Sequence, residues 1–257
     1  MLKIHPIPAF KDNYIWILHN ENYAAVIDPG TAQPVIDYLN CKKLQLISIL
    51  ITHHHNDHTG GIIELLNKFN VPVYGPHNKS IPTLTHNVKE NDKIQLKELS
   101  LTLKVLETPG HTTDHIVYYG ANKTKMLFCG DTLFACGCGR LFEGSAQQMH
   151  NSLQKLTNLP DDSMVYCTHE YTLENIRFAR TVEPGNLTLL EFEVTAKERR
   201  KQNIPTLPTT IKQEKATNPF LRCDQPEIIQ SACTHLGQDI TEPLRIFSTL
   251  REWKNHF

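Results

Sequence analysis

The chain has 257 residues, a formal net charge of −1, 21% charged residues and 40% hydrophobic residues. This composition is typical of a globular chain with one large domain, or with one domain and a smaller second one. No apolar run reaches the ~18 residues of a membrane span, and the first residues carry no apolar stretch of signal-peptide length. The nearly balanced charge provides no basic field for nucleic acid. We therefore expect no membrane and no nucleic-acid partner.

The counts of cysteine and histidine carry further information. Seven scattered cysteines, an odd number, do not fit a secreted disulfide scaffold and favour reduced thiols in the cytoplasm. The 14 histidines are the unusual feature of the composition, because several of them stand close together. A chain of this size can bury a sizeable core alone, so we expect a cytoplasmic monomer.

The first two thirds of the chain alternate short strands with helices. Apolar runs predict strands over residues 14–18, 23–27, 46–51, 94–96, 101–106, 115–119, 126–129 and 164–167, and helical spacing predicts helices over 32–40, 59–69 and 149–156. The aliphatic run 46–51 favours a strand that is covered on both faces. Strands with helices between them predict an α/β fold of layered sheets covered by helices.

The character of the chain changes near residue 170. Helical patterns follow over 187–201, 226–236 and 243–253, interrupted by a Pro/Thr-rich link over 204–210. This change predicts a larger domain over residues 1–170 and a smaller helical domain over residues 171–257.

A cluster of histidines follows the strand predicted over 46–51. His53 and His55 are two residues apart, so in an extended loop they point the same way, and Asp57 and His58 follow at the start of a helix. Imidazole and carboxylate are ligands of zinc-like and iron-like ions. The alternative is a polar turn or a helix N-cap made by Asp57. Desolvating these groups without a metal is costly, which favours a metal site with room for two ions.

Three further strand ends carry residues of the same chemical kind. His111 follows the strand over 101–106, Asp131 follows 126–129, and His169 follows 164–167. Alone, each has an ordinary explanation as a turn histidine, an Asx-turn aspartate or a surface histidine. Four strand ends that each present a ligand-type residue point together to one site.

These residues resemble a known pattern. Thr52, His53, His55, Asp57 and His58, followed by His111, Asp131 and His169, resemble the motif of the metallo-β-lactamase superfamily. Residues 12–16, 130–134, 137–144, 169–172, 182–186 and 218–222 are similar to the hydroxyacylglutathione hydrolase (glyoxalase II) family within it. The resemblance extends over essentially the whole chain. It implies a metallo-β-lactamase αββα sandwich, carrying the metals and the catalysis, with a smaller all-helical C-terminal domain that binds glutathione.

The resemblance also implies two divalent metal ions per chain. His53, His55 and His111 would hold the first ion, Asp57, His58 and His169 the second, and Asp131 would bridge them. Asp57 and Asp131 are the expected catalytic carboxylates. We expect zinc, with iron or manganese as alternatives, because such ligand sets accept all three.

The family's reaction follows as an expectation. The resemblance implies that a metal-bridging hydroxide attacks the thioester of S-D-lactoylglutathione, an S-2-hydroxyacylglutathione, and releases D-lactate and glutathione. This is the second step of the glyoxalase route of methylglyoxal detoxification. The developing oxyanion would be stabilised by the metal charge.

Four residues match the family's substrate-binding positions: Arg140, Tyr171, Arg251 and Lys254. Arg251 and Lys254 are three apart and share one helix face, which suits an anionic glutathione thioester, although a solvated helix face has the same pattern. Arg140 and Phe142 stand where some members have lysine and tyrosine, and these departures concern affinity rather than chemistry.

Two other functions remain open from the residues. One is an iron-dependent persulfide dioxygenase of the same superfamily, which would need a single iron site. The other is a non-catalytic binding module on the same fold. The complete second ligand set and the basic pair near the C-terminus favour the hydrolase.

Overall fold

A computed structural model describes residues 1–81, 83–121 and 124–257. The chain forms two compact units, which are described one at a time. Unit 1 comprises residues 1–107 and 114–130, and unit 2 comprises residues 108–113 and 131–257. In the described part of the chain, no helix is both long enough and apolar enough to cross a membrane.

Unit 1 opens with a mixed sheet. Its strands, in spatial order, are β1 (Lys3–Ala9), β2 (Asn13–His19), β3 (Tyr23–Ile27), β4 (Gln45–Leu50), β5 (Val73–Gly75) and β6 (His86–Asn87). Neighbouring strands run antiparallel from β1 to β3 and parallel from β3 to β6. The sequence patterns did not predict β1, because Pro6 and Pro8 interrupt it. Both prolines are tolerated there since β1 lies at the sheet edge.

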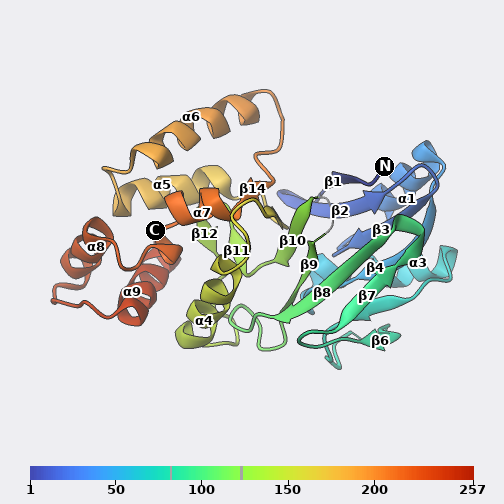
Figure 1. Cartoon of the computed structure of the whole chain (residues 1–257), viewed down its shortest axis with the longest axis horizontal. Helices are drawn as coiled ribbons and strands as arrows, with labels where there is room; N and C mark the ends of the chain where they lie inside the picture. Colours follow the sequence, from blue (N-terminus) through green and yellow to red (C-terminus); the bar gives the residue numbers. More distant parts are fainter. Residues whose placement is uncertain (82, 122–123) are drawn as a thin grey trace. The chain divides into compact units, whose positions relative to one another are not determined.

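Helices cover one face of this sheet (Figure 1). Val35 and Leu39 of α1 (Gln33–Lys42) and Leu65 of α3 (Ile62–Lys68) belong to one buried cluster with the inward-facing residues of the strands. Every residue of β2 is buried, so this strand is covered on both faces.

A second set of strands completes unit 1. It consists of β7 (Lys93–Leu96), β8 (Leu101–Glu107), β9 (Ile116–Ala121) and β10 (Lys125–Gly130), with the short helix η1 (Lys97–Leu99) between β7 and β8. These four strands are antiparallel neighbours. The fully buried Tyr118 of β9 donates its hydroxyl to the carbonyl of Ile51 at 2.6 Å, which ties this layer to the end of β4.

The helix predicted over 59–69 is divided. α2 (Asn56–Thr59) ends before Gly60 and Gly61, and α3 begins at Ile62. Gly61 donates its N–H to the Pro29 carbonyl at 2.9 Å, and a Cβ atom on Gly61 would lie only 2.6 Å from that oxygen. The two glycines therefore allow the backbone of residues 28–30 to approach the histidine-rich loop closely.

Unit 2 is mainly helical. Its elements are β11 (Leu133–Phe134), β12 (Gly137–Cys138), α4 (Ala146–Thr157), β13 (Met164–Cys167), α5 (Thr172–Val182), α6 (Leu187–Lys201), β14 (Thr209–Thr210), α7 (Ile211–Thr217), η2 (Pro219–Leu221), α8 (Pro226–Leu236) and α9 (Pro243–Asn255). β11 and β12 form a short hairpin, and β13 pairs with β14.

Helix α5 is central to the core of unit 2. Its Ile176 and Ala179 pack with Leu189 of α6. The Phe178 ring stacks on Phe220 and meets Trp253 edge-on. The helices predicted over 187–201 and 226–236 have these bounds in the structure, and α9 extends two residues beyond 253. Their starts were predictable because the Asn186 side chain caps α6 and prolines begin α8 and α9.

We predict that Gly61→Ala destabilises the chain by about 2 kcal/mol, because its new methyl group meets the backbone of residues 29–32. Urea unfolding followed by circular dichroism measures the change. Asn67→Ala, at an exposed position of α3, is the matched control and should shift stability by less than ~0.5 kcal/mol. Equal stability of Gly61→Ala and the control would contradict the close approach.

Candidate metal centre and substrate cavity

The histidine-rich loop of unit 1 is organised by a buried carboxylate. Asp28 accepts hydrogen bonds from the Thr52 N–H at 2.8 Å and from the Thr52 hydroxyl at 2.7 Å. The same carboxylate lies 3.0 Å from Nδ1 of His58, whose side chain is fully buried. A carboxylate against one ring nitrogen fixes the orientation of the ring and leaves Nε2 for a ligand. Asp28 therefore positions His58.

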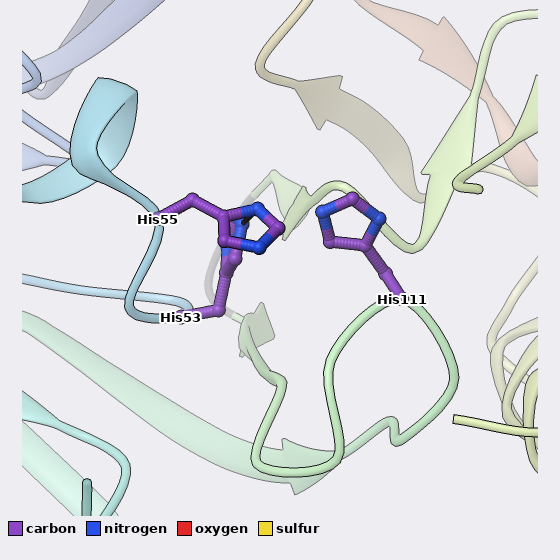
Figure 2. A group of neighbouring side chains, drawn as sticks. All are labelled: His53, His55 and His111. Atoms are coloured by element: carbon purple, nitrogen blue, oxygen red, sulfur yellow. Dashed lines mark hydrogen bonds between the residues drawn. The ribbon is translucent and has the colours of Figure 1, made fainter. Parts of the chain in front are cut away.

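The donor atoms of unit 1 form two close pairs. Nε2 of His53 lies 3.1 Å from Nδ1 of His55, and Nε2 of His58 lies 3.5 Å from Oδ2 of Asp57. Zinc bonds of 2.0–2.1 Å in a tetrahedron place neighbouring donor atoms about 3.4 Å apart. Figure 2 shows His53 and His55 on the loop that joins β4 to α2. Both pairs have the spacing of metal ligands.

Two neighbours that the sequence did not single out support this loop. Asn13, at the start of β2, donates its side-chain N–H to Oδ2 of Asp57 at 3.0 Å. The buried His115 stacks on His53 with ring centroids 4.8 Å apart.

Unit 2 gathers the other three predicted ligands. Oδ2 of Asp131 lies 3.4 Å from Nε2 of His111 and 3.5 Å from Nε2 of His169. His111 stands on the loop after β8 (Figure 2), and its Nδ1 lies 2.8 Å from the Arg140 carbonyl. A carbonyl only accepts, so Nδ1 carries the proton and Nε2 presents its lone pair. These separations and this tautomer suit an aspartate that shares metal ions with two histidines.

An aromatic group holds the ring of His169. Tyr171 stacks on it with centroids 4.6 Å apart and an interplanar angle of 5°, and Phe134 meets both rings edge-on. Phe134 was not predicted, since a single phenylalanine in a short hairpin gives no sequence signal.

Buried side chains fix the β11–β12 hairpin that separates Asp131 from Arg140. Glu214 of α7 accepts from the Cys136 N–H at 2.9 Å and from the Asn218 amide at 3.0 Å. The same Asn218 amide donates to the Gly137 carbonyl, and Asn175 donates to the Ala135 carbonyl, both at 2.9 Å. The hairpin backbone is therefore held by side chains rather than by a sheet.

Glu214 is a completely buried carboxyl group. Burial raises its pKa to about 7, although the hydrogen bonds that it accepts oppose this change. It therefore exchanges a proton in the physiological pH range while holding the Cys136 backbone.

A cavity of ≈ 470 Å³ opens in unit 2. It is lined by His111, Asp131, Phe134, Cys138, Arg140, Phe142, Tyr171, Glu174, Asn175, Arg177, Arg251, Lys254 and Phe257. The volume suits a small molecule or a short peptide. All four residues predicted to bind substrate line this cavity, together with two of the predicted metal ligands. The sequence did not indicate Glu174, Asn175, Arg177 or Phe257.

The predicted basic pair lies in the cavity wall. Arg251 is 3% exposed and donates to the Cys138 carbonyl at 2.8 Å. The Lys254 ammonium lies 5.3 Å from the centroid of Phe178, and burial, followed by the charge of Arg251, lowers its pKa to about 8. Both residues present basic groups to the cavity.

The cavity wall also contains a thiol. Cys138 is buried, and burial raises its pKa, although the nearby Arg251 charge opposes the effect. All seven cysteines are free thiols.

Comparison with known proteins identifies the family. The model of the metallo-beta-lactamase superfamily matches residues 10–169, and the model of the hydroxyacylglutathione hydrolase C-terminus matches residues 170–257. A hydroxyacylglutathione hydrolase of Nitrosomonas europaea is 58% identical over 100% of this chain and 97% of its own length. The chain belongs to the hydroxyacylglutathione hydrolase family. A second hydroxyacylglutathione hydrolase, of Vibrio vulnificus, is 51% identical over the full length of both chains.

Comparison with solved structures concerns the fold. ETHE1 from Myxococcus xanthus matches with a TM-score of 0.65 and 24% identity over 99% of this chain and 98% of its own. The BLEG-1 B3 metallo-beta-lactamase matches with a TM-score of 0.63 and 25% identity over 86% of this chain and 100% of its own. The predicted fold, a metallo-β-lactamase αββα sandwich with a C-terminal helical domain, is confirmed. The boundary predicted at 170/171 stays a prediction.

We predict that Glu214→Gln removes part of the pH dependence of stability. Between pH 4.5 and 7 the folded chain keeps the Glu214 proton and the unfolded chain loses it, so this group makes stability fall as pH rises. Glutamine cannot titrate. The variant should therefore gain stability relative to the parent from pH 5 to pH 7, by on the order of 3 kcal/mol at most.

Urea unfolding at unit pH steps from 5 to 8 measures this difference. Glu198→Gln, at an exposed position of α6, is the control and should follow the parent at every pH. A constant difference between Glu214→Gln and the parent over this range would contradict the raised pKa.

Proposed function

We propose that the chain is a binuclear metal-dependent thioester hydrolase that cleaves S-D-lactoylglutathione to D-lactate and glutathione. This would make it the second enzyme of the glyoxalase route of methylglyoxal detoxification. The observation that carries the proposal is the cavity of unit 2, whose wall combines His111 and Asp131 with the cations Arg140, Arg251 and Lys254. An anionic thioester in this cavity would have its reacting group beside ligand-type residues. Membership of the hydroxyacylglutathione hydrolase family supports the same substrate.

We assign two divalent metal ions to seven residues. They are His53, His55 and His111 for the first ion, Asp57, His58 and His169 for the second, and Asp131 for both. The donor spacings within each unit fit such ions, and the histidine nitrogens that face Asp28 and Arg140 leave Nε2 available. Bound there, the ions would supply a water of lowered pKa as nucleophile and positive charge for the developing oxyanion. Zinc is proposed, with iron or manganese as alternatives.

The chain's own residues prepare the reaction. Asn13 holds Asp57 in place, and the Tyr171–Phe134 pair holds the ring of His169. Arg251 and Lys254 would bind a carboxylate of glutathione, with Arg140 as a further cation and Tyr171 against the peptide. The leaving group is a thiolate, whose conjugate acid has a pKa of ~8.5, so no strong general acid is needed.

The proposal extends to organisation and location. Residues 1–170 would carry the metals and the chemistry, and residues 171–257 would bind glutathione. We place the protein in the cytoplasm, where glutathione is abundant and the seven thiols stay reduced, and we propose that it acts as a monomer.

The decisive experiment measures hydrolysis of S-D-lactoylglutathione by the purified protein, with metal content determined on the same sample. We predict turnover in samples that contain about two metal equivalents, and loss of turnover on chelation. Asp131→Asn should lose at least one metal equivalent and lower kcat by about a thousandfold, because the shared ligand is weakened. Glu198→Gln should behave as the parent. A parent protein that holds two metals without hydrolysing this thioester would contradict the function.

We further predict a pH-dependent KM that is set by Lys254. Its pKa near 8 means that the cation is lost as pH rises from 7 to 9, so KM for the anionic substrate should rise over this range. Lys254→Arg stays charged at these pH values and should flatten the profile. The ratio of the two KM values at each pH cancels other titrations. An unchanged ratio between pH 7 and 9 would remove Lys254 from substrate binding.

A further inference from the structure

Two charged residues in the cavity wall have no role in the family resemblance. Glu174 and Arg177 lie three residues apart in the first turns of α5, and both line the cavity. Nη2 of Arg177 lies 3.2 Å from Oε2 of Glu174, and the side chains are 61% and 71% exposed, respectively. The pair therefore stands at the open side of the cavity, in contrast to the buried Arg251.

The charges of the cavity are unequal in number. Of the lining residues that the structure describes, four are cations, namely Arg140, Arg177, Arg251 and Lys254, and two are acids. One acid is Asp131, which is predicted to bind metal. Glu174 is therefore the acid that remains to contact a bound small molecule. The Glu174 charge acts within the cavity, because it opposes the burial that lowers the pKa of Lys254.

The charges of the pair complement those of an amino-acid headgroup. An S-acylglutathione carries two carboxylates at opposite ends and one ammonium, which shares its carbon with the γ-glutamyl carboxylate. A cation and an anion side by side complement this ammonium and carboxylate, whereas a cluster of cations would repel the ammonium. Glu174 and Arg177 are such a neighbouring pair.

Breaking the Glu174–Arg177 ion pair when a ligand binds requires little free energy. An exposed ion pair contributes at most about 1 kcal/mol, so Glu174 and Arg177 can leave one another for ligand groups at little cost. The Arg177 guanidinium lies 5.0 Å from the centroid of the Phe257 ring, which limits its positions. Its planar fork suits a carboxylate.

We propose that Glu174 binds the ammonium and Arg177 the α-carboxylate of the γ-glutamyl group of the substrate. This inference rests on the proposed function, since it assumes a glutathione thioester in the cavity. It assigns the pair a role in selecting γ-glutamyl peptides over shorter thiols, and no role in the chemical step.

The test pairs each variant with a ligand that lacks its partner group. The probes are S-methylglutathione, its N-acetyl derivative without the ammonium, and S-methyl-cysteinylglycine without the γ-glutamyl group. Calorimetry gives their Kd, so the result does not depend on turnover. Glu174→Gln should raise Kd about fivefold for S-methylglutathione alone. Arg177→Gln should raise it for both ligands that keep the γ-glutamyl carboxylate, and neither variant should change binding of S-methyl-cysteinylglycine.

Controls separate this inference from the proposed function. Glu198→Gln disrupts an exposed pair of the same spacing with Lys201 on α6, outside the residues that line the cavity, and should leave every Kd unchanged. With S-D-lactoylglutathione as substrate, Glu174→Gln should raise KM and leave kcat unchanged. Equal effects of Glu174→Gln on the acetylated and free ligands, or none on either, would overturn the inference even if hydrolysis stands. If the Kd values change as predicted but the protein does not hydrolyse S-D-lactoylglutathione, the proposed function is wrong and the inference about Glu174 and Arg177 stands.

Discussion

The cavity of unit 2 depends on one buried carboxyl group. Glu214 holds the Cys136 N–H and the Asn218 amide, and Asn218 in turn holds the Gly137 carbonyl. Without these contacts the Cys136 N–H and the Gly137 carbonyl would lose their side-chain partners, which is costly for buried polar atoms. The hairpin separates Asp131 from Arg140, and the Arg140 carbonyl fixes His111. The carboxyl group of Glu214 in α7 thus supports the hairpin between Asp131 and Arg140, and through the Arg140 carbonyl it supports His111.

In unit 1, too, one buried carboxylate has several partners. Asp28 secures both the backbone and the hydroxyl of Thr52 and faces His58. The close contact of Gly61 with the Pro29 carbonyl keeps this carboxylate beside the loop. In each unit the donor atoms are 3.1–3.5 Å apart. This spacing suits ligands that share one ion.

How far the sequence predicted this molecule depends on the range of the interactions. The ligand-type residues were recognisable because they follow apolar strands at fixed short spacings, as at His53 and His55. The sequence did not predict strand β1, because Pro6 and Pro8 fit a strand only at a sheet edge, and the position of a strand in its sheet is a tertiary property. The division of the helix after Thr59 and the role of Glu214 arise from contacts with distant segments. Glu174 and Arg177 look like any helical ion pair until the cavity is known.

The wall thiol has a consequence for a protein that handles thioesters. Cys138 lines the cavity, and a thiolate there could take the acyl group from a bound thioester or exchange with a glutathione disulfide. Burial raises the pKa of Cys138 and so disfavours the thiolate, which is a far better nucleophile than the thiol. Burial of this thiol therefore disfavours both its acylation by a thioester and its exchange with a disulfide.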